Sequence, residues 1–255
     1  MRSVAEFAYA QARIEARHGE RLEDAGWKTL DSAQSLSRYL ERARSTSLKR
    51  FLAPISLDLS AHAIDGVLRR EAALYVGEIA AWAPRRWQPA IAWLAALPLL
   101  PLVGGLRGDA SPPDWVGEDA ALATLAGAGS DAPANAAGLV RFVGTSGAPS
   151  DVGRRWLRRW RALWPQGDPS NADLARLVSQ ALRALGSPSR VQEATGGQSF
   201  RRDLDGVLTR FFRSHVASPV ALVSHVGLVL IDLERLRGGL ARRSLFAAEE
   251  ERIAT

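Results

Sequence analysis

The chain has no cysteine among its 255 residues, and it has only four histidines and one methionine. Without cysteine it can form no disulfide, no cysteine-ligated zinc or iron–sulfur site and no thiol nucleophile. The histidines are scattered, lack a paired spacing of four residues and form no HExxH sequence, so they predict no metal centre. We therefore expect no metal and no cofactor, and the lack of cysteine fits a reducing, cytoplasmic location.

A long hydrophobic run is also missing. The most apolar stretch, residues 89–103, is shorter than the roughly 20 residues that a membrane span needs, and three prolines interrupt it. It predicts a buried hairpin or helix pair. The first residues carry several charges and no apolar core, so we expect no signal peptide.

The composition is typical of a globular protein that can bury a core, with 47% hydrophobic and 24% charged residues. Apolar residues recur at helical spacing almost throughout, and only residues 139–143 and 220–223 could be extended. The sequence thus predicts an all-α fold. A segment rich in glycine and proline suggests three parts: a helical unit (1–103), a loop-rich connector (104–149) and a second helical unit (150–255).

Helix boundaries follow from prolines, glycines and capping residues. Ser60, with Asp58 as an alternative, is expected to cap a helix that Pro84 ends. Gly238 and Gly239 are expected to interrupt the last helix. The predicted helices cover residues 4–17, a hairpin within 27–44, then 48–52, 60–83, 151–164, 171–185, 200–216 and 219–236, followed by a polar tail at 240–253.

One six-residue sequence motif occurs twice, with a single substitution. Asp-Gly-Val-Leu-Arg-Arg at residues 65–70 returns 140 positions later as Asp-Gly-Val-Leu-Thr-Arg at residues 205–210. An aromatic ring or imidazole follows each copy at the same offset, at Tyr75 and His215. The repetition predicts two related units of helical hairpins around a concave face, an architecture that usually scaffolds or binds.

The net charge is +6, and a large part of it lies in an Arg/Trp segment, residues 154–164. On a helical wheel its tryptophans share one face and its five arginines take the other. The arginines could bind nucleic acid, the tryptophans could dock on a membrane surface, or both could bind a protein partner. The tryptophans could equally be core residues beneath a solvated arginine face. The candidate partner-binding residues here are Arg154, Arg155, Trp156, Arg158, Arg159 and Trp160.

Charged residues also occur within the apolar helix at residues 230–239. Asp232 or Glu234 could pair with Arg235 or Arg237, as exposed pairs of little energetic value or as one buried pair that confers specificity. Glu234 and Arg237 complete the candidate partner-binding residues.

Signals for catalysis are weak. Asp65, Glu71 and Glu78 share a helix, but such residues usually face solvent. Ser/His/Asp combinations occur by composition alone, without a Gly-x-Ser-x-Gly sequence, and the glycine pairs are not phosphate loops. We expect no enzymatic activity.

Two regions resemble the family of C subunits of V-type ATPases. The first is the N-terminal region, with Phe-Ala-Tyr-Ala-Gln-Ala-Arg-Ile at residues 7–14, Tyr39-Leu40 and the helix around Leu68-Arg69. The second is the C-terminal region, where Glu234, Leu236, Arg237 and Gly239 occupy positions close to those of the family's Glu-x-x-Asn-Leu-Arg sequence and the glycine that follows it. The chain is identified as a shortened or divergent member.

The resemblance implies a non-enzymatic coupling or assembly subunit that links the central stalk to the membrane rotor ring in proton or ion transport. Its partners would be rotary ATPase stalk and ring subunits. It would be cytoplasmic and peripheral to the inner membrane, reaching the membrane only through those partners. The alternatives are a helical adaptor of another bacterial complex and, less favoured, a nucleic-acid-associated protein that uses the Arg/Trp segment.

Overall fold

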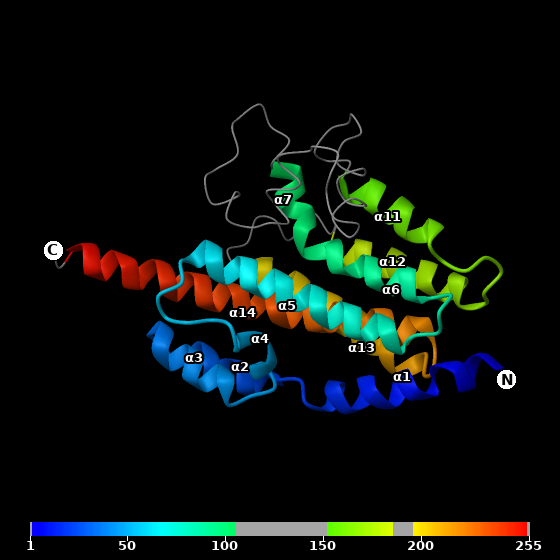
Figure 1. The fold of residues 1–255 in the computed structure, drawn as a ribbon, viewed down its shortest axis with the longest axis horizontal. Coiled ribbons are helices and arrows are strands. Elements are labelled where there is room, and N and C mark those ends of the chain that lie inside the picture. The colour runs from blue at the N-terminus through cyan, green and yellow to red at the C-terminus, as the bar shows by residue number, and fades with distance from the viewer. Residues whose placement is uncertain (1, 106–151, 186–195, 254–255) are drawn as a thin grey trace.

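The computed structural model describes residues 2–105, 152–185 and 196–253, and within these ranges it contains helices and no strand (Figure 1). The predicted all-α fold is confirmed. The helices are α1 (Arg2–Gly19), α2 (Asp24–Asp31), α3 (Leu36–Arg44), α4 (Lys49–Leu52), α5 (Ala61–Trp82), α6 (Gln88–Ala92), the 3₁₀ helix η1 (Trp93–Leu99), α7 (Leu100–Gly105), α11 (Val152–Ala162), α12 (Ser170–Leu185), α13 (Gly196–Ser214) and α14 (Pro219–Ile253).

The caps of the N-terminal helices act as local chemistry predicts. The Ser60 hydroxyl accepts a hydrogen bond from the Ala63 N–H at 3.1 Å, so Ser60 rather than Asp58 caps α5. Ser35 accepts from the Arg38 N–H at 3.3 Å at the start of α3. Pro84 follows the end of α5, as predicted.

Helix α14 runs unbroken from Pro219 to Ile253. The helix predicted over residues 219–236 is confirmed, and residues 220–223, which could have been extended, are helical. The predicted interruption at Gly238-Gly239 was wrong. A glycine inside a helix costs about 1 kcal/mol relative to alanine, an amount that tertiary packing readily offsets. Here Arg243 supplies part of that packing, because its guanidinium donates to the carbonyl oxygens of Ala33 and Asp31, each at 2.8 Å.

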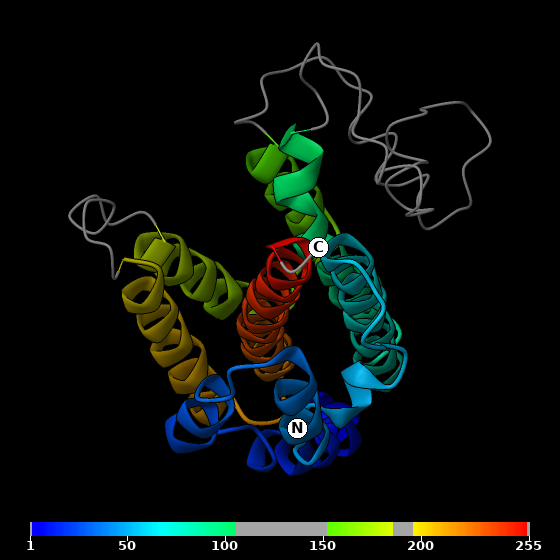
Figure 2. The ribbon, with the colours of Figure 1, turned by 90° about the vertical axis from the view of Figure 1, so that its left-hand side faces the viewer.

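Helix α14 lies at the centre of the bundle (Figure 2). Viewed along its axis, α5 and α6 lie on one side, α12 and α13 on the other, and α1 to α4 beneath it. Buried residues from all three described ranges form one hydrophobic core. The predicted helical units 1–103 and 150–255 therefore share a core, since α14 of the second packs on α1, α3 and α5 of the first. Residues 106–149 of the predicted connector lie outside the described residues.

The two copies of the repeated motif, residues 65–70 and 205–210, lie in α5 and α13, the helices that flank α14. In each copy the aspartate belongs to an ion network that reaches α14. Asp65 Oδ1 is 3.7 Å from Arg237 Nη1, and Asp205 shares the guanidinium of Arg21 with Asp232. The origin of the two helices as related units stays a prediction.

Stacked cations and aromatic rings join α1 to α5. The Arg17 guanidinium lies 4.4 Å from the ring centre of Trp82 and 5.1 Å from that of Tyr75, and the Arg50 guanidinium lies 4.4 Å from the ring centre of Tyr75. Glu78 accepts from Arg17 at 2.5 Å and from Arg50 at 2.8 Å. These hydrogen bonds, that of Arg17 foremost, lower the pKa of Glu78. The carboxylate therefore holds the two arginines in place as a structural charge.

A histidine of the central helix is bonded to the same tyrosine. The Tyr75 hydroxyl and His225 Nε2 are 2.7 Å apart, and the His225 side chain is fully buried. Burial, reinforced by the nearby His18, Arg21 and Arg17, lowers the pKa of His225 to about 3. His225 is therefore neutral at physiological pH and belongs to the packing of α14 against α5.

Candidate functional site

A basin with a volume of about 1120 Å³ opens between the end of α1, helix α2, and helices α13 and α14. Its lining combines many charges with a little apolar surface. The cations are Arg21, Lys28, Arg201, Arg202, Arg213, Arg235 and Arg242. The carboxylates are Glu23, Asp24, Asp31, Asp205 and Asp232, and the apolar side chains are Leu22, Trp27 and Ile231.

Arg21 forms the floor of the basin. Its Nε and Nη2 donate to the two carboxylate oxygens of Asp232 at 2.7 and 3.0 Å, and Nη2 also donates to Asp205 at 3.0 Å. Burial opposes the charge of Arg21, but the hydrogen bonds to Asp232 and Asp205 raise its pKa above the ordinary value. Burial raises the pKa of Asp232, and Arg21 opposes that rise. The floor is therefore a compact charge network that ties the end of α1 to α13 and α14.

A second ion pair attaches α2 to the central helix. Arg235 Nη2 donates to Asp31 Oδ2 at 2.8 Å, and its guanidinium lies 4.6 Å from the ring centre of Trp27. Asp24 is a more distant and exposed partner at 3.8 Å. The charge of Arg235 is thus matched by carboxylates of α2.

The remaining cations of the basin differ from Arg21 and Arg235. Within the described ranges, no carboxylate forms an ion pair with Lys28, Arg201, Arg202, Arg213 or Arg242. Four of these five side chains are exposed and Arg201 is half-buried. Because Arg21 and Arg235 are matched inside the molecule, these cations are the unmatched positive charge that the basin presents to solvent. An anionic group from another molecule could pair with them without displacing an internal contact.

The tryptophans of the Arg/Trp segment pack inside the protein. Trp156 and Trp160 are buried, and their rings stack with centres 5.5 Å apart. Trp160 Nε1 donates to the Ala90 carbonyl of α6 at 2.8 Å. Of the six predicted candidates on α11, Arg154, Arg158 and Arg159 are exposed, Arg155 is half-buried, and the two tryptophans are core residues. Only the arginine face is open to a partner.

Glu234 and Arg237 pair with each other on an exposed face of α14. Arg237 Nε donates to Glu234 Oε2 at 2.9 Å, one of the exposed pairs that the sequence suggested. The buried alternative also exists, but with an unforeseen partner, because Asp232 binds Arg21 rather than Arg235 or Arg237. None of the eight predicted candidates lines the basin.

Sequence reasoning missed the basin, although one signal was available. Arg202, Gly206, Thr209 and Arg213 recur at helical spacing and place polar groups on one face of α13. The partners of that face, at the end of α1 and in α2 and α14, are distant in the sequence. No local pattern indicates that they meet.

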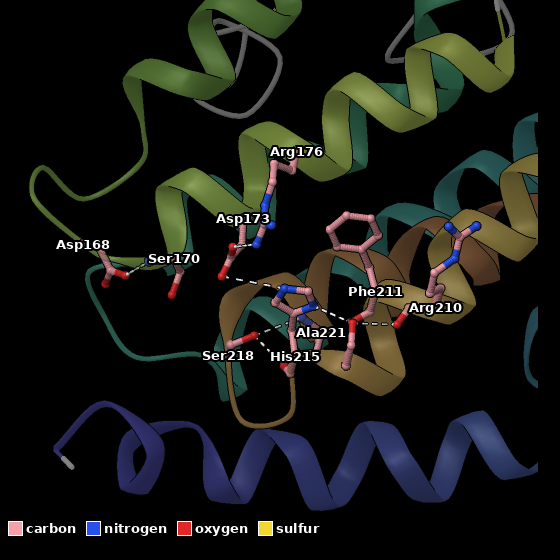
Figure 3. Close-up of polar contacts among 10 residues, drawn as sticks. Asp168, Ser170, Asp173, Arg176, Arg210, Phe211, His215, Ser218 and Ala221 are labelled. Atoms are coloured by element: carbon pink, nitrogen blue, oxygen red, sulfur yellow. Dashed lines mark hydrogen bonds and ion pairs between the residues drawn. The ribbon is translucent and has the colours of Figure 1, made fainter.

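His215 and Asp173 lie close together at the end of α13 (Figure 3), and Ser214 precedes the histidine in the chain. His215 Nδ1 is 2.8 Å from Ser214 Oγ, and Nε2 is 3.7 Å from Asp173 Oδ2. Nδ1 also bonds to the Phe211 carbonyl at 3.1 Å, and because a carbonyl only accepts, this bond requires the proton on Nδ1.

That proton prevents His215 from acting as a base toward Ser214. The Ser214 hydroxyl donates instead to the Arg210 carbonyl at 2.8 Å. A nucleophilic serine needs the opposite arrangement, with its proton directed at an unprotonated ring nitrogen. The group therefore satisfies the last carbonyls of α13 and joins that helix to α12.

Two further findings concern metals and membranes. No group of three or more histidine or carboxylate side chains in the part of the chain that the structure describes could hold a metal ion. Within the same part, the helices are too short or too polar to cross a bilayer.

Comparison with known proteins finds no matching protein-family model, no similar curated protein and no similar solved structure. The resemblance to the C subunits of V-type ATPases therefore depends on the quoted sequence segments alone.

Proposed function

We propose that the protein is a non-enzymatic assembly or coupling subunit that binds another protein through the basin between α1, α2, α13 and α14. The observation that supports this proposal is the contrast between two groups of charges in the basin. Arg21 is paired with Asp232 and Asp205, whereas Lys28 and the arginines 201, 202, 213 and 242 form no ion pair with a carboxylate of the described residues. Charged rims of this kind steer and orient a partner of opposite charge. The ion pairs of Arg21 and Arg235 join α2, α13 and α14, the helices that carry these cations, and so fix the relative positions of the helices.

The role in a V-type ATPase is the particular form of this proposal that the sequence resemblance suggests. A coupling subunit needs a concave surface for the central stalk. Helix α14 fills the centre of the described bundle, so the basin at its side is the concave surface that such a partner would use. An adaptor of another complex would use the same surface with a different partner.

Affinity purification from the host organism in gentle detergent, followed by mass spectrometry, tests the proposal. Three proteins are compared: the wild type, the basin variant Arg202→Glu/Arg213→Glu and the matched α11 variant Arg158→Glu/Arg159→Glu. Both variants reverse two exposed arginines. We expect specific partners with the wild type and the α11 variant, and their loss with the basin variant.

Each result has a distinct meaning. Recovery of V-type stalk and ring subunits supports the coupling role, and recovery of another complex supports the adaptor role. If partners disappear with the α11 variant alone, the binding surface is the arginine face of α11. If no variant changes the recovered proteins, the proposed function is wrong.

The arginine face of α11 also provides the test for nucleic acid. Binding through Arg154, Arg158 and Arg159 would weaken steeply with salt, because each phosphate contact releases counterions. A salt-insensitive signal, or one that the α11 variant leaves unchanged, would exclude this alternative.

A further inference from the structure

We infer that the basin receives an acidic segment of a protein partner, which lies along the exposed face of α13. This inference rests on the proposed function and adds the chemistry of the partner. It follows from the spacing of the cations on α13, the charges of the opposite wall and a glycine that packing does not require.

The cations of α13 are spread along the helix rather than gathered at one point. Arg202 and Arg213 both line the basin, eleven residues apart in α13. At 1.5 Å per residue their backbones are about 16 Å apart along the axis. A single phosphate or a small dicarboxylate cannot reach both. A segment with acidic side chains spaced over about three helical turns, or over about five extended residues, can do so.

The opposite wall distinguishes a protein segment from a polyanion. Helix α2 and the residue before it present the exposed carboxylates Glu23 and Asp24 at the basin, next to the exposed cation Lys28. A nucleic-acid strand or an anionic lipid surface carries negative charge on every side and would meet these carboxylates as well as the cations. A protein segment can direct its acidic residues toward α13 and neutral or basic residues toward α2.

Gly206 lies on the basic face of α13, between Arg202 and Arg213. A Cβ atom at this position would meet nothing within 4 Å, so packing inside the protein does not require glycine there. Glycine inside a helix costs about 1 kcal/mol relative to alanine. The absence of a side chain there leaves room for a partner backbone to approach α13 closely between the two arginines.

Gly77 provides a matched control for Gly206. It is also an exposed glycine inside a helix with open space at its Cβ, but it lies on α5, away from the basin. Gly206→Leu and Gly77→Leu should therefore both fold, with unchanged or slightly raised stability. Only Gly206→Leu should obstruct the segment.

The test is a selection of 16-residue peptides from a random phage-displayed library on the immobilised wild-type protein at physiological salt. We expect enrichment of peptides rich in Asp and Glu. The affinity of the selected peptides should fall about tenfold or more for Arg202→Glu/Arg213→Glu and for Gly206→Leu, which corresponds to at least about 1.4 kcal/mol. For Arg158→Glu/Arg159→Glu and Gly77→Leu it should stay within about twofold.

Three outcomes would overturn the inference: selected peptides without acidic enrichment, acidic peptides that bind the α11 variant as weakly as the basin variant, or a 16-nucleotide oligo-dT that binds the basin more tightly than the peptides do. A natural partner that depends on the basin while the selected peptides are not acidic would leave the proposed function intact. A natural partner that is recovered equally well with the wild type and with the basin variant would contradict the proposed function itself.

Discussion

Gly239 of α14 is the residue against which the ring of Tyr39 packs. A Cβ atom at Gly239 would lie 2.2 Å from the Tyr39 hydroxyl oxygen and 2.5 Å from the ring carbon that bears it. The Tyr39 side chain is fully buried, and the Arg243 guanidinium lies 4.1 Å from its ring centre. Burial raises the pKa of Tyr39 to about 12. The glycine thus permits the close approach of α3 to the second half of α14.

Gly239→Ala should lower the free energy of unfolding by about 1–3 kcal/mol, because the new methyl group cannot fit beside a rigid ring without shifting two helices. Its neighbour Gly238 is exposed with open space at its Cβ, so Gly238→Ala should raise stability by up to about 1 kcal/mol. Urea unfolding monitored by circular dichroism measures both. Equal effects of the two substitutions would contradict the packing of Tyr39 on α14.

Acid should destabilise the protein through His225 before most carboxylates titrate. Its pKa is about 3 in the folded protein and 6.5 ordinarily. Below pH 6.5 the unfolded chain binds a proton that the folded protein does not, so the stabilisation by neutral His225 is lost as the pH falls toward 3. The loss approaches about 1.4 kcal/mol per pH unit. Burial and Arg21 also lower the pKa of His18, which acts in the same direction.

Urea midpoints at pH 7.0 and 5.0 test this expectation. His225→Gln keeps a polar group near Tyr75 but cannot be protonated, so its midpoint should change less with pH than that of the wild type. His62→Gln, at an exposed position, serves as the control and should retain the wild-type dependence. If His225→Gln shows the same pH dependence as the wild type, neutral His225 is not the cause.

Removal of the Arg21 guanidinium should leave the Asp232 carboxylate buried without its cation. Arg21→Gln is expected to lower the free energy of unfolding by about 3–5 kcal/mol. Asp232→Asn in the same chain should recover part of this loss, because a neutral amide costs less to bury than a charge. A double variant that is no more stable than Arg21→Gln would show that the pair contributes little.

Trp160→Phe should destabilise the protein by about 1–3 kcal/mol, since it removes the hydrogen bond to the Ala90 carbonyl and part of the packing between α11 and α6. Arg158→Glu/Arg159→Glu should change stability by less than about 0.5 kcal/mol per residue, because both side chains are exposed. Thermal unfolding of the two variants separates the packing face of α11 from its solvent face. A larger loss in the arginine variant would reverse the assignment of the faces.

Local signals in the sequence predicted most of the helices. Ser60 and Pro84 act on backbone groups within a few residues, so their effect on α5 could be inferred without knowledge of the fold. The prediction at Gly238-Gly239 was wrong because the energy that retains the helix comes from Tyr39 and Arg243, and the partners of these residues lie about 200 positions away in the chain.

For the candidate site, the sequence indicated the local helical pattern but not the contacts between helices. The amphipathic pattern of residues 154–164 correctly described a helix with two faces, but it did not reveal that Trp160 bonds to Ala90. The arginines of α13 can be identified in the sequence. Whether they are available to bind a partner depends on whether carboxylates of other helices pair with them in the folded protein.

The sequence by itself determined the all-α character, most helix ends and the absence of cysteine chemistry, since these follow from side-chain spacing and local backbone preferences. Only the tertiary structure decided that α14 runs through Gly239, that Asp232 takes Arg21 as its partner, and that the basin keeps unmatched cations. Ion pairing and close packing are set by distances in space, and the residues that meet around α14 are separated by up to 212 positions along the chain.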